Sequence, residues 1–392
     1  MSVPRMRHVT PAFRTFSGTD ALASLPREMD RLGVSRVVVF CGASMKRSGD
    51  ALARVEGALG TRLAGRFDGV LAQSPLPAVE TARQALEDAE ADAVVAVGGG
   101  SAIVTARAAS ILLAEGRDIR ELCTSRTGDG RLSSPSLRAP KLPQWVVPST
   151  PTTAYAKAGS AVRDPATGER LALFDPKTRA QGIFLDPSVA LTAPPALTQS
   201  ASLNAFAMTV EGLQSEVDDP LAEAQLAYAL RMISEWLPRL RADPGDPEPR
   251  LRLMLGALLC GQGSDYLSGG LAQALSHAAG PRSLVANGVI EALLLPYVMR
   301  YNAPVTAGRL ARVADALGRS RLAGEETPDV RAVAAVERVL AEAGVPTRLR
   351  DVGIDRGALP EVAKHTMEDW ALTQVPRPAS RSELTDLLST AW

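Results

Sequence analysis

The stretch from Asp92 to Ala109 reads DAVVAVGGGSAIVTARAA and predicts a buried strand that turns directly into a helix. The turn consists of four small residues: Gly98, Gly99, Gly100 and Ser101. Because glycine has no side chain, backbone N–H groups at the helix N-terminus can approach an anion closely there. The turn therefore favours a phosphate site, with a nucleotide as the first ligand to consider. The same glycines also fit a tight strand-to-helix turn that needs positive φ and binds nothing.

The composition is that of a globular enzyme. A chain of 392 residues with 46% hydrophobic composition can bury a large core, and this length usually divides into two domains. With 43 basic and 43 acidic residues the net charge is zero, which argues against nucleic-acid partners and an anionic membrane surface. The three scattered cysteines form no disulfide framework, and neither a signal peptide nor a membrane span is evident. We therefore expect a cytoplasmic protein with a small-molecule substrate.

The hydrophobic pattern changes near Pro195. Before it, short apolar runs alternate with helical stretches and predict strands at 36–40, 93–97, 144–147 and 182–185. Such alternation predicts a parallel sheet covered on both faces. After it, helical periodicity continues over 203–214, 220–241, 251–279, 289–301 and 330–343. The chain thus reads as an α/β domain over residues 1–193 and an all-α domain over residues 194–392, with a surface loop at 124–143.

A second polar segment follows the third predicted strand. Residues 148–160 read PSTPTTAYAKAGS and are dense in hydroxyl groups and small side chains. Hydroxyls of Thr152, Thr153 and Ser160 can reach ribose or phosphate oxygens, and Lys157 or Arg170 can add positive charge. The composition alone favours a structural loop.

The order and spacing of these pieces resemble the iron-containing alcohol dehydrogenase superfamily, and within it the maleylacetate reductases. The likeness runs nearly end to end and is carried by VGGGS at 97–101, the hydroxyl-rich loop, FLDP at 184–187, NAFAMTVE at 204–211 and GLAQALSH at 270–277. The resemblance implies a Rossmann-like dinucleotide-binding domain followed by a helical domain, with substrate in the cleft between them. It further implies a nicotinamide hydride donor and a homodimer.

The resemblance also shows where the chain departs from its family. Metal-dependent members bind Fe²⁺ or Zn²⁺ with an Asp and a His four residues apart, and with two later histidines. The matching positions here hold Asn204, Met208, Gln273 and Asn287. Amides and a thioether provide neither charge nor imidazole, so they make a poor divalent site, and we expect no catalytic metal. Asn204 resembles the maleylacetate reductases, which work without metal, although those generally keep histidines that this chain lacks.

The segment after the first predicted strand bears on the choice of nucleotide. Relatives that prefer NAD tend to have an Asp there, which accepts from the ribose 2′-hydroxyl and repels a 2′-phosphate. Gly42 matches that position, and Ser44, Lys46 and Arg47 can meet a phosphate. NADPH is favoured, with NADH possible. Alternatively, Lys46 and Arg47 are only the solvated start of a helix. By the same resemblance, Arg107 and Arg170 stand where relatives have lysines.

Carbonyl reduction without a metal needs donors for the developing alkoxide and a proton source. The resemblance places the amides of Asn204, Gln273 and Asn287 around one point, where they can serve as donors. His277 is the expected proton donor, because it lies four residues after Gln273 on the same helical face and its family counterpart lines the active site. Without the resemblance, a single histidine on an amphipathic helix would be taken as structural.

Tyr155 and Lys157 form a second possible acid pair. The ammonium can lower the pKa of the phenol if both face the nicotinamide. Two residues apart, they equally fit one face of an extended segment without a catalytic role.

Two classes of function follow. The first is a metal-independent NAD(P)H-dependent reductase of a small carbonyl, enone or oxo-acid. The second is a scaffold without redox chemistry, either a lyase, cyclase or isomerase or an inactive cofactor-binding protein. The glycine turn and the hydroxyl-rich loop together favour the first class, because a chain that had discarded the nucleotide would not need both. Failure to bind both NADPH and NADH in a fluorescence titration would rule the first class out.

Overall fold

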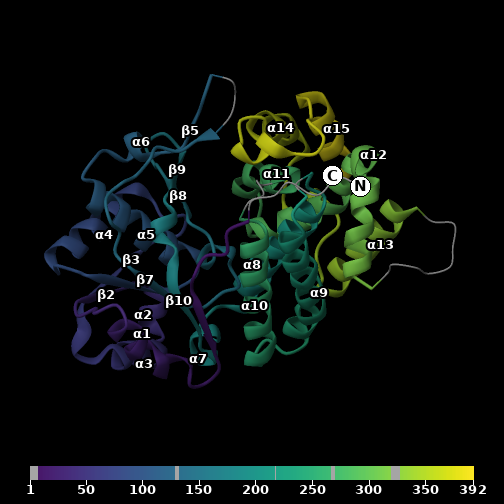
Figure 1. Cartoon of the computed structure of the whole chain (residues 1–392). Coiled ribbons are helices and arrows are strands. Elements are labelled where there is room, and N and C mark those ends of the chain that lie inside the picture. The colour runs from purple at the N-terminus through teal and green to yellow at the C-terminus, as the bar shows by residue number, and fades with distance from the viewer. Residues whose placement is uncertain (1–7, 129–131, 217, 266–269, 319–326) are drawn as a thin grey trace. The chain divides into compact units, whose positions relative to one another are not determined.

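The computed structural model describes residues 8–128, 132–216, 218–265, 270–318 and 327–392. They form two compact units, Thr10–Pro194 and Pro195–Trp392, and Figure 1 labels most of their helices and strands. His8 and Val9 belong to the second unit, whereas the sequence pattern assigned them to the first domain. A side-chain contact accounts for this difference, because Nδ1 of His8 lies 2.8 Å from Oδ2 of Asp219 in the helical unit.

The first unit is built on a six-stranded parallel sheet in the order β1-β10-β7-β4-β2-β3. Its strands are β1 (Arg14–Ser17), β2 (Val37–Gly42), β3 (Leu63–Val70), β4 (Ala93–Gly98), β7 (Gln144–Pro148) and β10 (Ala180–Leu185). The four strands expected from the sequence are confirmed and form the centre of the sheet. The sequence analysis missed the two edge strands, β1 and β3, because neither has a continuous apolar run: β1 is mostly exposed and β3 is mostly half-buried.

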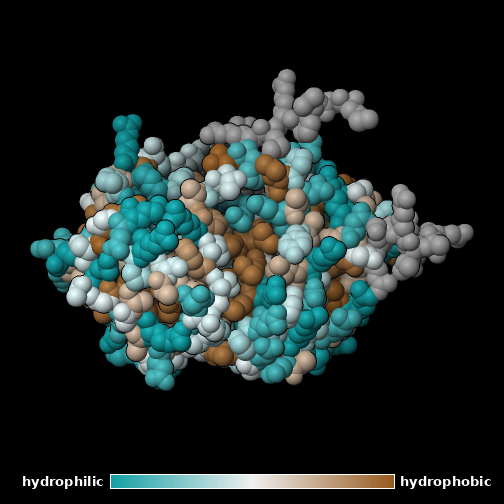
Figure 2. All heavy atoms as spheres, turned by 60° about the horizontal axis from the view of Figure 1, so that its bottom comes forward, coloured by the Kyte–Doolittle hydropathy of each residue, from teal (hydrophilic) through white to brown (hydrophobic). Residues whose placement is uncertain are grey.

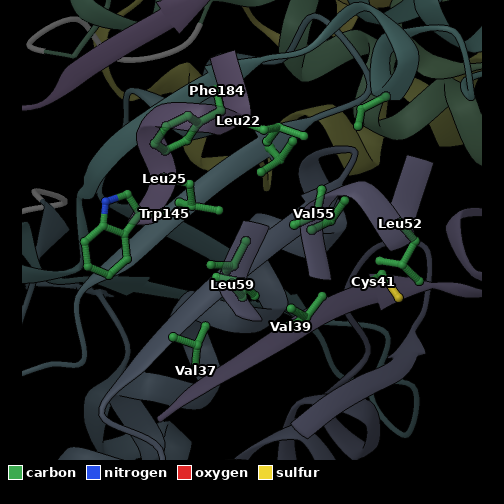
Figure 3. Close-up of a cluster of buried hydrophobic side chains, with 14 of the residues drawn as sticks. Leu22, Leu25, Val37, Val39, Cys41, Leu52, Val55, Leu59, Trp145 and Phe184 are labelled. Atoms are coloured by element: carbon green, nitrogen blue, oxygen red, sulfur yellow. The ribbon is translucent and has the colours of Figure 1, made fainter. Parts of the chain in front are cut away.

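Helices cover the sheet and bury both faces of its central strands. They are α1 (Leu25–Asp30), α2 (Ala43–Arg47), α3 (Gly49–Leu59), α4 (Leu76–Asp88), α5 (Gly100–Glu115), α6 (Ile119–Leu122) and α7 (Pro187–Ala190), with 3-10 turns η1 (Ala21–Ser24), η2 (Gly60–Arg62), η3 (Thr153–Tyr155) and η4 (Pro176–Thr178). Figure 3 shows the core between α1, α3 and the sheet, where Val37 and Val39 of β2 meet Val55 and Leu59 of α3. Each such side chain contributes about 1.5–3 kcal/mol by leaving water.

Two small antiparallel sheets complete this unit. β5 (Ser125–Arg126) pairs with β6 (Leu132–Ser133), within the segment that the sequence predicted to be a surface loop. β8 (Gly159–Arg163) pairs with β9 (Arg170–Phe174). The hydroxyl-rich segment therefore runs into a strand at its end, which its composition did not indicate.

All regular secondary structure among the described residues of the second unit is helical. It contains α8 (Pro195–Leu213), α9 (Pro220–Ala242), α10 (Pro247–Gly263), α11 (Leu271–Ala279), α12 (Asn287–Ala316), α13 (Pro328–Glu342), α14 (Leu359–Thr366) and α15 (Arg381–Ala391), with η5 (Gly280–Arg282), η6 (Leu349–Val352), η7 (Arg356–Ala358) and η8 (Trp370–Gln374). The single periodic stretch at 251–279 is in fact two helices, because α10 ends after Gly263 and α11 begins after Gly270. Conversely, α12 runs on past Pro304, which the sequence rules read as a helix end.

The outer surface is mixed in character. On the face shown in Figure 2 most of the outermost residues are hydrophilic, with hydrophobic residues among them. Across the described part of the chain, we find no helix that combines the length and the apolar character needed to cross a bilayer.

Candidate functional site

The glycine turn joins β4 to the N-terminus of α5. Gly98 has φ +134°, a conformation that residues with a side chain rarely adopt, and Gly99 is the N-cap of the sixteen-residue α5. A Cβ on Gly99 would lie 3.3 Å from Oγ1 of Thr150, and one on Gly100 would lie 3.2 Å from Oγ1 of Thr152. The structure thus brings the glycine turn and the hydroxyl-rich loop into contact. Helix N–H groups and threonine hydroxyls together can cradle a phosphate.

This turn lies where the order of the parallel sheet reverses. From β2 the chain continues to β3 on one side, and then to β4 on the other side of β2. Gly42 and Gly98 end these two neighbouring strands, and the crevice at such a switch point is where open α/β sheets bind ligands. On the far side of β4, the N–H of Ser149 donates to the carbonyl of Gly98 at 2.9 Å, which places the start of the hydroxyl-rich loop there too.

The residues after β2 form the short helix α2. Gly42 is its N-cap, and Ser44 and Lys46 are exposed. Nζ of Lys46 lies 2.5 Å from Oδ2 of Asp68 at the end of β3. The hydrogen bond from this ammonium holds the pKa of the Asp68 carboxyl below its ordinary value. Asp68 was not singled out in the sequence because β3 was not recognised as a strand.

Arg107 holds the hydroxyl-rich loop in place by hydrogen bonds from its side chain. This residue of α5 is completely buried, and its guanidinium donates to the carbonyl of Gly159 at 2.6 Å and to that of Ala154 at 2.8 Å. Sequence reasoning noted Arg107 only as a departure from the family pattern. The structure shows that it connects the helix of the glycine turn to both ends of the loop segment 154–159.

The other predicted cofactor residues of this loop differ in exposure. Oγ1 of Thr152 accepts the N–H of Ala154 at 3.3 Å, and Thr153 is buried. Ser160 is buried as well, and its Oγ finds no hydrogen-bond partner within the described part of the chain. Ser101 is engaged outside the loop, since its Oγ accepts the N–H of Gln73 at 3.2 Å. An unsatisfied buried hydroxyl such as that of Ser160 is costly unless a ligand pairs with it.

Three further predicted residues lie in or beside this loop. Tyr155 is completely buried within the first unit, whereas Lys157 is half-buried. Arg170 is exposed on β9, directly opposite Arg163 of β8. These two residues therefore place like charges in directly opposed positions of the β8–β9 sheet.

In the helical unit, three mutually packed helices carry the residues that the resemblance placed at the family's metal positions. Asn204 and Met208 lie on α8, Gln273 on α11, and Asn287 is the first residue of α12. Sδ of Met208 accepts from Oγ of Ser264 at 3.3 Å. Oδ1 of Asn287 fills the space where a Cβ on residue 280 would stand. These four side chains by themselves provide neither a charged ligand nor an imidazole, which are the usual protein ligands of Fe²⁺ and Zn²⁺.

Glu291 is a carboxylate at this place that sequence reasoning missed. It is buried on α12, one turn after Asn287, and Nδ2 of Asn204 donates to its Oε2 at 2.5 Å. The spacing of four residues from Asn287 was the available signal, since residues i and i+4 share a helical face. One of the two N–H bonds of the Asn204 amide is thus directed at Glu291.

His277 is paired with an acid from far along the chain. Its Nδ1 lies 2.8 Å from Oδ2 of Asp369, and both side chains are nearly buried. The ring of Trp370 packs nearby with a centroid distance of 6.4 Å. Asp369 also escaped sequence reasoning, because 92 residues separate it from His277 and no motif links them.

Glu211 holds the beginning of α11. Its Oε1 accepts the N–H of Ala272 at 2.7 Å, and its carboxyl fills the space where a Cβ on residue 270 would stand. Burial disfavours the charged form and raises the pKa of Glu211 to about 7, although the N–H groups of Ala272 and Gln273 act in the opposite direction. The carboxyl group that anchors the helix of Gln273 and His277 is therefore half-protonated near neutral pH.

Glu211→Gln is expected to change how stability depends on pH. Between its ordinary value of 4.5 and about 7, Glu211 binds more protons in the folded than in the unfolded state. The free energy of unfolding therefore falls as the pH rises through this window, by on the order of 2 kcal/mol. Urea unfolding at pH 5 and pH 7.5 measures the change. The glutamine variant should lose this slope, whereas Glu235→Gln on the exposed face of α9 should keep it; equal slopes in all three proteins would refute the assignment.

Comparison with known proteins matches nearly the whole chain. A family model described as iron-containing alcohol dehydrogenase matches residues 12–187, and one described as the C-terminal part of the Fe-containing alcohol dehydrogenase family matches residues 198–392. Maleylacetate reductase 1 of Cupriavidus pinatubonensis is 27% identical over 381 residues, which cover 97% of this chain and 95% of that protein. Lactaldehyde reductase of Escherichia coli is 28% identical over 382 residues, covering 96% and 97%. The solved structure of a 1,3-propanediol oxidoreductase has the same fold, with a TM-score of 0.89 at 22% identity over 99% of this chain and 100% of that one.

Proposed function

Because this chain belongs to the iron-containing alcohol dehydrogenase superfamily and is therefore an oxidoreductase, we propose that it is a metal-independent, NAD(P)H-dependent reductase of small carbonyl compounds. Relatives named maleylacetate reductase favour an enone or oxo-acid as the substrate. One contrast carries the proposal. The glycine turn is intact and packed against threonine hydroxyls, whereas the positions that the resemblance matches to the family's metal ligands hold two asparagines, a glutamine and a methionine.

The first unit is the proposed nucleotide-binding part. The N–H groups that follow Gly99, together with the hydroxyls of Thr152 and Ser160, suit the pyrophosphate and ribose. When bound, the reduced nicotinamide supplies a hydride to the substrate carbon. Ser44 and Lys46 after β2, where no carboxylate follows directly, support NADPH over NADH.

Asp68→Asn is expected to strengthen NADPH binding. In the proposed complex Lys46 faces the 2′-phosphate, while the carboxylate of Asp68 competes for the same ammonium and repels the phosphate. Because the pair is exposed, the gain in affinity should be roughly fivefold at low salt and should vanish at high salt. Fluorescence titration with NADPH and NADH measures it. Affinity for NADH should not change, and Glu87→Gln, which breaks the Arg83–Glu87 pair on α4, serves as the control. An equal gain for both nucleotides would contradict the placement of Lys46.

In the helical unit, neutral amides take the role that a metal has in other members. The proposed donors to the developing alkoxide are Gln273, Asn287 and the second N–H of Asn204. His277 supplies the proton to the alkoxide oxygen. Tyr155 is the weaker acid candidate, because a phenol that is completely buried within the first unit has no exposed surface to offer a substrate.

Turnover after metal removal tests the proposal. The protein is dialysed against EDTA, checked for residual metal by elemental analysis, and supplied with NADPH and a panel of maleylacetate, lactaldehyde and glyoxylate. NADPH oxidation at an undiminished rate supports the proposal. Activity that is lost with the metal and restored by Fe²⁺ or Zn²⁺ would refute metal independence. Binding of NADPH without oxidation by any compound would favour the non-redox alternative, and failure to bind either nucleotide would overturn the proposal altogether.

The proposal also covers the cellular compartment and the oligomeric state of the enzyme. The three cysteines are free thiols, which suits a reducing compartment, and we place the protein in the cytoplasm. Burial raises the pKa of Cys41 and of Cys123 to about 11, so neither thiol is poised as a nucleophile. We further propose a homodimer, which light scattering after size-exclusion chromatography tests directly.

A further inference from the structure

We infer that Asp369 is a positioning residue for His277, holding the imidazole in the tautomer that is protonated on Nδ1 and leaving Nε2 as the atom that exchanges a proton with the substrate. The inference rests on the proposed function, in which His277 provides the proton. It adds a residue from the C-terminal segment to a site whose other members lie on α8, α11 and α12.

The carboxylate of Asp369 has a fixed orientation. Its Oδ1 accepts the N–H of Ala371 at 2.8 Å and so caps η8, while the backbone N–H of Asp369 donates to the carbonyl of Thr366 at 3.0 Å. This leaves Oδ2 directed at Nδ1 of His277, 2.8 Å away. The acceptor is therefore held by the backbone on either side of it, and the ring must adjust to the carboxylate.

An ionised carboxylate can only accept a hydrogen bond, so its partner nitrogen on the imidazole must carry the proton. Both side chains are nearly buried, with 14% and 11% exposed, so solvent weakens the interaction little. Within the described part of the chain, Nε2 of His277 has no hydrogen-bond partner. Nδ1 is thus occupied by the protein, and Nε2 is the nitrogen available for chemistry.

The proton balance follows from this assignment. As hydride reaches the carbonyl carbon, the electron pair of the C=O bond passes to oxygen, and the N–H bond at Nε2 of the imidazolium breaks as the O–H bond forms. The neutral ring that remains keeps its Nδ1 proton on Asp369. Asp369 does not change protonation in this step. It ensures that the ring gives up the proton at Nε2 and no other.

Asp369→Asn tests the inference, because the capping bond predicts which way the new amide will lie. If Oδ1 continues to accept the N–H of Ala371, the NH₂ group must face Nδ1 of His277, and a donor there demands the opposite tautomer. We expect the variant to carry its proton on Nε2. We further expect kcat to fall about a hundredfold or more, with KM little changed, because a ring in the wrong tautomer cannot be stabilised as imidazolium.

The tautomer is read by NMR on protein labelled with ¹⁵N-histidine, since the two ring nitrogens differ strongly in chemical shift. Only three histidines occur in the chain, and His277→Asn identifies the relevant signal. The matched control is Glu368→Gln, which removes an exposed carboxylate 3.7 Å from Nδ1 of His365 and should change neither the tautomer of His277 nor turnover.

The outcomes separate this inference from the proposed function. An unchanged Nδ1–H tautomer in the Asp369→Asn protein overturns the inference, whatever the rate. An inverted tautomer with unchanged kcat for the compound of the panel that is reduced also overturns it, and in that case His277 is not the proton donor although hydride transfer stands. Inversion together with the loss of kcat supports it. Circular dichroism and thermal unfolding confirm that the variant is folded.

Discussion

Replacing Arg107 with methionine is expected to lower the free energy of unfolding of the first unit by about 3 kcal/mol, because two partly buried hydrogen bonds from a charged donor are lost. Methionine keeps the length and apolar body of the side chain, so the cost reflects the lost bonds to Ala154 and Gly159 and not a cavity. Urea unfolding monitored by fluorescence measures it, with Trp145 as a buried reporter in the same unit.

The same variant should bind NADPH more weakly, because the loop that Arg107 holds includes Thr152, whose hydroxyl lies at Gly100. We expect roughly a tenfold loss of affinity, or about 1.4 kcal/mol. The control is Arg117→Met, which removes an exposed arginine just beyond the end of α5 and should change stability by less than about 0.5 kcal/mol. Full stability of the Arg107→Met protein would show that the two carbonyls are satisfied in another way.

Replacing His277 with asparagine is expected to reduce kcat by about 10²- to 10⁴-fold, the usual contribution of a general acid, while KM and the affinity for NADPH change little. Asparagine is close in size and can still donate to Asp369, so α11 should remain in place. Steady-state kinetics after metal removal provide the measurement. His365→Asn, on the exposed face of α14, should keep wild-type turnover. A kcat within twofold of wild type would remove His277 from the mechanism.

The candidate site could be assembled from the sequence where its parts are contiguous along the chain. The glycine turn, the hydroxyl-rich loop and the segment after β2 could each be found because a strand end and the residues that follow it are neighbours along the chain. That they meet at one edge of the sheet also follows from strand alternation, because parallel strands direct their carboxyl ends to the same edge. The family assignment, which the comparisons confirm, drew on the same contiguous motifs.

What sequence reasoning missed are partners brought together by folding. Asp68 faces Lys46 only because β2 and β3 are neighbours in the sheet, and β3 lacks the apolar pattern that would have revealed it as a strand. Glu291 reaches Asn204 only because α8 packs against α12. Neither carboxylate belongs to a recognisable motif in its own segment, so the neighbouring residues do not indicate that it has a partner elsewhere.

The α/β and all-helical halves, the four central strands and the glycine turn are evident from the residues alone, because hydrophobic periodicity and glycine geometry act over a few neighbouring residues. Three features emerge only from the folded chain: the bonds of Arg107 to the loop, the contact of Asp369 with His277, and the division between α10 and α11. Hydrogen bonds and burial between distant segments depend on how helices and strands pack. The spacing of residues along the chain does not predict that packing.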